Sequence, residues 1–389
     1  MALEHWLCVT IREAMIDVAG AANDGTVAQG AKGWLGLPLW SLAFPIVGVP
    51  AVLVSLYAMG TIGLIAAAVI LIGAVVSAVH QAEVVAHRVG EPFGTLVLAV
   101  AVTVIEVSLI VSLMVSGSGD VSALARDTVF AAIMIILTFI IGLCLLTGGV
   151  MHGEQRFTLR GISAALATLA ALTVLSLILP NYTTSAAGPT YAPSQLIFVA
   201  VVSLVLYGTF VLVQTVRHRD YFLPAGDVEP EAHVAPPSDE TAWAAFGVLL
   251  VALVVVVLLA KGLSAKIEQA VISAGLPLAV VGVMIAGLVL APESLAAFNA
   301  ARRDRLQTSL NLALGSALAT IGLTIPAVAI VSLVLGLPLA LGIGAKAMTL
   351  LALSLFVTTI SLGTGRTTIL QGVVHLVIFA AYLFTTVVP

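Results

Sequence analysis

Charged residues are scarce in this chain of 389 residues. They make up 9% of the sequence, whereas hydrophobic residues make up 61%. Soluble domains carry roughly 25% charged residues. A soluble fold cannot bury so many apolar side chains, so the composition predicts a polytopic membrane protein. The net charge of −4 is too small to indicate a charged partner, and no basic stripe interleaved with aromatic residues suggests nucleic acid.

Cysteine is also rare, and a secretory leader pattern is missing. Cys8 and Cys144 lie far apart, and Cys144 lies in an apolar stretch, so we expect no disulfide. The first 36 residues lack the basic region and apolar core of a cleavable signal peptide. We interpret residues 1–36 as a loosely ordered N-terminal tail, or as an extension that results from a translation start assigned too far upstream. An interfacial helix over residues 3–19 is the alternative.

Apolar stretches of about 20 residues, each long enough to cross a bilayer, dominate the remainder. They lie at residues 38–58, 61–86, 93–117, 127–148, 160–180, 194–216, 242–261, 271–298, 306–335, 338–361 and 368–388. Backbone polar groups must bond internally in lipid, so these eleven stretches predict helices. The fold class expected is therefore all-α, with about 11 transmembrane helices. Pro326 should kink or break the longest of them.

The arginines and lysines are distributed unevenly between the two ends of these predicted helices. Eleven of the fifteen fall on the side of the N-terminus, three on the other side, and Lys346 within a stretch. Basic residues favour the cytoplasmic side. We expect a cytoplasmic N-terminus and an outer C-terminus in a cell membrane, with membrane lipid as a partner.

A polar segment at residues 217–241 divides the chain. It contains six acidic residues and four prolines, so we interpret it as a solvated cytoplasmic linker, with a cation-sensing loop as the alternative. A first helix (37–60) would precede two sets of five helices (61–216 and 242–389). Because five is odd, the second set enters the membrane inverted relative to the first, which is the plan of many secondary transporters.

Two acids lie inside the apolar stretches. Glu106 is near the middle of the third stretch, and Glu293 occupies a similar position in the second half. A carboxylate at that depth costs on the order of 2.5–3.5 kcal/mol by insertion scales. Such acids persist when they are paired, face water or have a function. We predict that Glu106 and Glu293 together bind a metal cation or protons; a structural pairing of Glu106 with Lys346 is the alternative.

Hydroxyl groups near the two acids are candidate ligands, because calcium takes 6–8 oxygen ligands. Thr103 lies one turn before Glu106, and Ser316, Thr320 and Thr324 recur every four residues. This spacing favours Ser316 and Thr320 as ligands, although such hydroxyls often bond their own backbone.

Pro292 directly precedes Glu293. It should disrupt the turn near Leu288 and expose carbonyl oxygen to a cation, with a packing kink as the alternative.

Proton transfer could involve further side chains. His80, Glu83 and His87 have spacing that places them near one helix face, as a proton relay or a helix-end network. His375 lies within the last apolar stretch, as a packing residue or a proton carrier. Two nearby carboxylates in low dielectric disfavour the doubly ionised state, so protons and a divalent cation should compete for them. That competition is the physical basis of antiport.

Three segments carry a resemblance to a known family. They are AEVVAHRVGEPFGTLVLAVAVTVIEVSLI, APESLAAFNAARRDRLQTSLNLALGSALATIGLTIP and TGRTTILQGVVHLVIFAAYL. They resemble the bacterial calcium–proton antiporters of the CAX branch of the calcium/cation antiporter superfamily, from about Leu37 to the C-terminus. The resemblance implies eleven spans in inverted halves.

The resemblance also assigns cation-binding roles. It implies that Glu106 and Glu293 bind the cation, that Gly315-Ser316 matches a family motif, and that Glu83 matches an acid of the first repeat. Many relatives have Gly-Asn before each signature acid. Here those places are Val102-Thr103 and Val289-Leu290, and Lys261 is the counterpart of Glu83 in the second repeat.

The expected function is exchange of cytoplasmic Ca²⁺ for protons, with no cofactor and no enzymatic activity. Because the amide ligands are missing, a sodium or potassium–proton antiporter is the main alternative. An intramembrane hydrolase built on His80, Glu83 and His87 and a passive cation channel are further alternatives.

Overall fold

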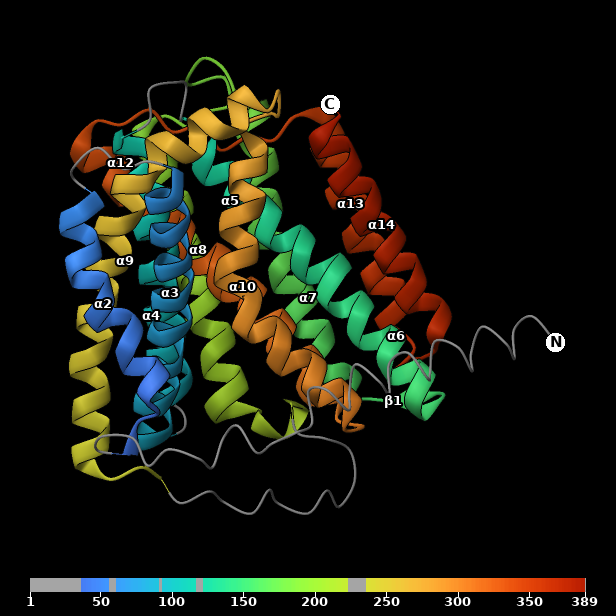
Figure 1. The fold of residues 1–389 in the computed structure, drawn as a ribbon. Helices are drawn as coiled ribbons and strands as arrows, with labels where there is room; N and C mark the ends of the chain where they lie inside the picture. Colours follow the sequence, from blue (N-terminus) through green and yellow to red (C-terminus); the bar gives the residue numbers. More distant parts are fainter. Residues whose placement is uncertain (1–35, 56–60, 91–92, 117–121, 223–235, 389) are drawn as a thin grey trace.

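The computed structural model describes residues 36–55, 61–90, 93–116, 122–222 and 236–388. Within these ranges the protein is a bundle of long helices (Figure 1). The expected N-terminal tail up to residue 35 and the central part of the acidic linker, residues 223–235, lie outside the described residues.

Helices account for almost all of the described chain. The first half contains α2 (Leu39–Ser55), α3 (Thr61–Val89), α4 (Phe93–Ser116), α5–η3–α6 (Leu124–Met134, Ile135–Ile140, Ile141–His152), α7–η4–η5 (Leu159–Thr173, Val174–Ile178, Leu179–Tyr182), α8–η6 (Pro193–Leu212, Val213–Arg217) and η7 (Arg219–Phe222). The second contains α9 (Asp239–Ser273), α10 (Ala279–Arg302), α11–η8–α12 (Leu306–Ala319, Thr320–Thr324, Ile325–Leu335), α13 (Ala345–Leu362) and α14 (Ile369–Val387). Ten of the described helical segments are long and apolar enough to cross a membrane, and α2 is a shorter apolar helix. The predicted all-α membrane fold is confirmed.

Three predicted boundaries differ clearly from the structure. Helix α9 continues to Ser273 rather than ending at residue 261, and α10 begins at Ala279 rather than at residue 271. Hydropathy marks the apolar part of a helix, whereas its hydrogen bonds continue through polar residues such as Lys266. The stretch predicted from residue 338 becomes helical only at Ala345, because the preceding segment is extended and its Ile343 amide bonds to the carbonyl of Leu177.

A π-helical turn interrupts one long helix in each half. Residues Ile135–Ile140 form η3 between α5 and α6, and Thr320–Thr324 form η8 between α11 and α12. The break predicted near Pro326 therefore lies in the turn directly before it. A π-turn displaces the hydrogen-bond ladder by one residue and is frequent at functional sites, and η8 carries two of the hydroxyls singled out in the sequence.

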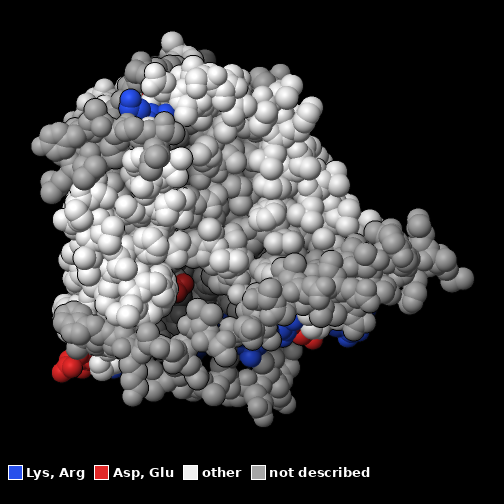
Figure 2. All heavy atoms as spheres, in the orientation of Figure 1, with Lys and Arg blue, Asp and Glu red and all other residues white. Residues whose placement is uncertain are grey.

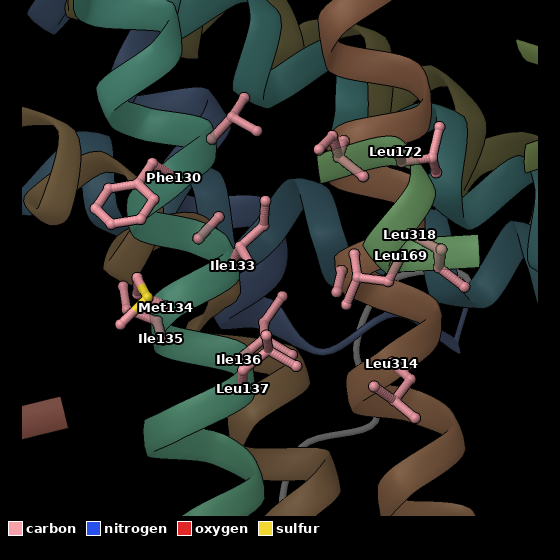
Figure 3. Close-up of a cluster of buried hydrophobic side chains, with 14 of the residues drawn as sticks. Phe130, Ile133, Met134, Ile135, Ile136, Leu137, Leu169, Leu172, Leu314 and Leu318 are labelled. Atoms are coloured by element: carbon pink, nitrogen blue, oxygen red, sulfur yellow. The ribbon is translucent and has the colours of Figure 1, made fainter. Parts of the chain in front are cut away.

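The buried side chains form two large apolar clusters. One joins α3, α9 and part of α2, and the other joins α5 to α8 and α11 to α14. Figure 3 shows part of the second cluster, where Ile133, Ile136 and Leu137 lie on the side of their helix that faces Leu169 and Leu314, and Phe130 and Met134 lie on its other side. Helices α4 and α10 contribute buried residues to both clusters. The two acid-bearing helices therefore lie at the boundary between the clusters.

Close helix contacts depend on glycine at two places near this boundary. A Cβ at Gly282 of α10 would lie 2.9 Å from the backbone of Asp127 in α5, and one at Gly322 of η8 would lie 2.7 Å from Tyr207 in α8. Small residues let membrane helices approach closely, because lipid supplies little hydrophobic force between them. These contacts hold η8 against α8 and α10 against α5.

One end of the bundle is strongly basic. Nine arginines of the described residues lie at helix ends or loops there: Arg88, Arg156, Arg160, Arg217, Arg219, Arg302, Arg303, Arg305 and Arg366. We call this the basic end. It also holds the two-stranded pairing of β1 (Gln155–Arg156) with β2 (Arg366–Thr367). In Figure 2 basic side chains are seen along the lower edge of the molecule.

Candidate cation site

Glu106 is enclosed by protein near the middle of α4. Only 2% of its surface is exposed. The Thr324 hydroxyl donates a hydrogen bond of 2.8 Å to its Oε2 atom, and the Thr320 side chain also bonds to the carboxyl group. Both hydroxyls come from η8. The π-turn of the second half therefore supplies the polar contacts of the acid in the first half, which offset the cost of burying it.

Glu293 lies near the middle of α10, which contacts α4. Its charge is close enough to interact with that of Glu106. Its Oε2 atom is buried and has no hydrogen-bond partner among the described residues. An unpaired buried carboxylate oxygen is costly, so this atom is placed to bind a proton or a cation. The predicted proximity of the two acids is thus present in the structure.

A cavity of about 380 Å³ adjoins Glu293. It lies between α4, α8, α10 and α11. It is lined by Leu98, Ala99, Val102, Thr103, Tyr207, Phe210, Val211, Gln214, Phe222, Glu293, Thr308, Asn311, Leu312, Gly315, Ser316, Ala319 and Thr320. The polar side chains of α11 and η8 extend along one wall from Thr308, near the basic end, to Thr320. Figure 2 shows a hollow in the lower half of the surface with acidic atoms inside it.

The three predicted neutral ligands line this cavity. Thr320 lies between the cavity and Glu106, since it lines the first and bonds to the second. Thr103 donates its hydroxyl to the carbonyl of Ala99 at 2.8 Å, which is the self-bonding alternative for this residue. Its oxygen can still accept a bond or a cation. Ser316 lies on the same wall as Thr320.

The predicted disruption at Pro292 is not seen as a break. Helix α10 continues from Ala279 through Pro292 to Arg302. The carbonyl of Leu288 still loses its usual amide donor, because proline has none. Ser294 donates its hydroxyl to the carbonyl of Leu290 at 2.6 Å. Helix α10 therefore lacks one backbone hydrogen bond, at the carbonyl of Leu288, and is otherwise continuous.

Glu83 and His80 lie beside the site on α3. The His80 Nδ1 atom is 4.0 Å from Oε2 of Glu83, and the charge of Glu83 interacts with that of Glu293. His80 Nε2 is buried without a hydrogen-bond partner among the described residues, and its ring lies 5.1 Å from that of Trp40 in α2. His87 is exposed near the end of α3. The structure therefore brings Glu83, but not His87, close to the acid pair.

Two other residues considered from the sequence lie elsewhere. His375 is fully buried between α14 and η3, where its Nδ1 bonds to the carbonyl of Leu137 at 2.7 Å. It does not line the cavity. Lys346 is exposed and donates to the carbonyl of Thr385. The alternative in which Lys346 pairs with Glu106 is therefore wrong.

Several polar residues of the site were not selected from the sequence. Thr324 continues the series of hydroxyl residues, one every four positions, that favoured Ser316 and Thr320 as ligands. This spacing was the feature of the sequence that could have identified Thr324 as part of the site. Tyr207, Gln214 and Asn311 line the cavity from α8, η6 and α11. Their contribution depends on the packing of α8 against α12 and η8, which no local pattern in the sequence reports.

A multi-pass membrane protein with paired acids at mid-depth beside a cavity has the features of an ion transporter. The profile of the sodium/calcium exchanger protein family matches residues 59–216 and 244–388. The chain belongs to this family of cation exchangers. Its predicted membership of the calcium/cation antiporter superfamily is confirmed at that level.

Relatives of known sequence agree with this assignment. The chain is 50% identical to y4hA of Sinorhizobium fredii over 91% of this chain and 97% of the relative. It is 36% identical to the sodium-potassium/proton antiporter ChaA of Escherichia coli over 79% of this chain and 84% of ChaA. It is 25% identical to a Ca²⁺/H⁺ antiporter of Aphanothece halophytica over 79% of this chain and 86% of that protein.

Solved structures share the fold. The native structure of YfkE superposes with a TM-score of 0.69 at 15% identity, covering 90% of this chain and all of that one. The H⁺/Ca²⁺ exchanger CAX superposes with a TM-score of 0.68 at 18% identity, covering 89% of this chain and 88% of that one. At these identities the likeness establishes the all-α membrane fold.

Proposed function

We propose that this protein exports Ca²⁺ from the cytoplasm in exchange for protons, with Glu106 and Glu293 as the groups that bind both. The observation that carries the proposal is the unpartnered, buried Oε2 of Glu293 beside the cavity, close to the carboxylate of Glu106. Two carboxylates provide up to four oxygen ligands, and Thr103, Ser316 and Thr320 provide hydroxyl oxygens.

Competition at these carboxylates couples the two ions. Without a cation, two nearby acids in low dielectric favour bound protons. A divalent cation neutralises both charges and displaces the protons, so the site holds one or the other. The change of access would occur at the boundary where α4 and α10 pack against both apolar clusters.

The two halves would form inverted repeats. Each half contains a long helix with a π-turn, η3 or η8, directly after its acid-bearing helix, α4 or α10. This correspondence supports the residue ranges expected for the repeats, 61–216 and 242–389. The basic end would face the cytoplasm of a bacterial cell, with the C-terminus of α14 outside.

A sodium or potassium–proton antiporter is the second candidate. It is favoured by Val102-Thr103 and Val289-Leu290, which supply no side-chain amide oxygen before the two acids. It is also favoured by the 36% identity to a protein named as a sodium-potassium/proton antiporter. Monovalent cations need fewer charged ligands than Ca²⁺, so this site could accept them.

Proton flux in proteoliposomes tests these proposals. The purified protein is reconstituted with an internal pH-sensitive dye, the membrane potential is clamped with an ionophore, and Ca²⁺, Na⁺ or K⁺ is added separately. We expect Ca²⁺ to drive proton movement in the opposite direction. A response to Na⁺ or K⁺ without one to Ca²⁺ would replace the main proposal by the second candidate.

The remaining alternatives give different results in the same vesicles. A passive channel would conduct the cation without opposed proton movement. A hydrolase built on His80, Glu83 and His87 would keep its activity in Glu293→Gln, whereas exchange requires that carboxylate. Glu240→Gln, at the exposed start of α9, is the matched control for loss of one acid.

A further inference from the structure

The cavity beside Glu293 is larger than an inorganic cation requires. Its volume is about 380 Å³, and one water molecule occupies about 30 Å³ of liquid. A cation with six waters would fill roughly half of it on that scale. Pockets for small organic molecules have volumes of about 300–1,000 Å³. The size therefore fits a small organic ligand.

The walls of the cavity are mostly apolar, with a few polar groups. Leu98 of α4, Phe210 of α8 and Leu312 of α11 contribute to them. The rings of Phe210 and Phe222 meet edge to face, with their centres 5.8 Å apart. Aromatic faces attract organic cations, and apolar walls attract hydrocarbon. These apolar side chains add little to the binding of a hydrated metal ion.

The acidic group gives the cavity its charge preference. Glu293 presents a buried oxygen without a partner among the described residues, and it lines the cavity. Gly315 also lines the cavity and keeps that part of the wall open, because a Cβ there would meet no atom within 4 Å. The cavity thus places one acidic side chain beside an apolar space that a hydrocarbon chain can enter.

We propose that this cavity binds organic ammonium ions with a short apolar tail, the ammonium group at Glu293 and the tail against Leu98, Phe210 and Leu312. Such ions would compete with the exchanged cation and proton for Glu293. The predicted competition rests on the proposed function, whereas the predicted binding does not. A lipid acyl chain, which lacks a positive charge, is the competing occupant.

Binding of hexyltrimethylammonium to the protein in lipid nanodiscs tests the proposal, measured by calorimetry without transported cations or a pH gradient. Its charge is permanent, so it cannot carry protons. Each CH₂ group should tighten binding about threefold to fourfold, so tetramethylammonium, which lacks five of these groups, should bind about 250- to 1,000-fold more weakly. Hexanol, which has the tail without the charge, should not compete. Equal binding of hexanol would indicate a lipid-like occupant and overturn the proposal.

Variants of the wall locate the bound ion. Gly315→Leu fills the cavity and should abolish saturable binding, whereas Gly208→Leu, an exposed glycine of α8 with no atom within 4 Å of a Cβ, should leave it unchanged. Leu98→Ser should keep binding but reduce the dependence on tail length. Unchanged binding in Gly315→Leu would show partition into lipid and overturn the proposal.

The flux assay separates this inference from the proposed function. If the protein exchanges cations normally in the presence of hexyltrimethylammonium and does not bind this ion in nanodiscs, the inference is overturned and the proposed function stands. If the protein binds hexyltrimethylammonium saturably but exchanges no cation for protons, the proposed function is overturned and the inference stands. Inhibition of exchange that is lost in Gly315→Leu supports both.

Discussion

Glu106 and Glu293 occupy similar places in two 24-residue helices but differ in their surroundings. Glu106 is 2% exposed and accepts hydrogen bonds from Thr324 and Thr320. Glu293 lines a cavity and leaves one buried oxygen without a partner among the described residues. One acid is held by hydrogen bonds from the protein, and the other borders a cavity and keeps an unsatisfied oxygen.

This difference suggests a division of roles at the proposed site. An acid fixed by two hydroxyls has a defined position, so Glu106 can serve as the anchor of the cation. An acid that faces the cavity is the first charge met by an entering ion. Thr320 connects the two because it lines the cavity and bonds to Glu106. Substitutions at these residues can therefore separate anchoring from access.

Removal of either charge should have the largest effect. Glu106→Gln and Glu293→Gln are each expected to reduce cation-driven proton flux by more than about 100-fold, because a buried charge that pairs with a cation contributes several kcal/mol. Initial rates in proteoliposomes measure this. Glu240→Gln should retain the full rate, and near-normal exchange in either glutamine variant would contradict the proposed site.

Shortening each acid by one CH₂ group should distinguish the two positions. Glu106→Asp is expected to reduce the rate about 10-fold or more, because the carboxylate can no longer reach the fixed hydroxyls of η8. Glu293→Asp should mainly raise the cation concentration needed for half-maximal flux, since the cavity lets a cation move toward the shorter acid. Equal losses of rate in the two variants would remove the proposed division of roles.

Loss of a hydroxyl should have a smaller effect, and again an unequal one. Thr324→Val removes the donor to Glu106 and should weaken apparent cation affinity about 10- to 30-fold, as expected for a hydrogen bond to a charged group of about 1.5–2 kcal/mol, the lower part of the usual range. Thr103→Val keeps the shape and removes a hydroxyl that bonds to Ala99, so we expect less than about a threefold change. The reverse order would make Thr103 the more important ligand.

His375 should affect stability more than transport. His375→Leu leaves the carbonyl of Leu137 without its donor and should cost about 1–3 kcal/mol, seen as a lower melting temperature in detergent. The exchange rate per folded molecule should remain within about twofold, because His375 does not line the cavity. A change in the pH dependence of exchange with unchanged stability would instead support its role as a proton carrier.

Much of the site could be predicted because membrane burial makes polar residues conspicuous. An acid in an apolar helix is costly, so Glu106 and Glu293 stood out by position alone. The four-residue spacing pointed to one hydroxyl-bearing face of α11 and η8. The same reasoning could not tell which hydroxyl bonds to Glu106. Thr103 lies one turn before Glu106 and was an equally good candidate, but its hydroxyl bonds to the backbone of its own helix.

The sequence by itself determined the membrane class, the helices and the two acids, because hydropathy and isolated charges are local properties of the chain. Tertiary structure decided how the acids differ. The contacts of Glu106 come from η8, 218 residues away in the chain, and the cavity beside Glu293 exists only because α4, α8 and α11 leave a space there. Hydrogen bonds and voids between distant helices depend on packing, which no single segment encodes.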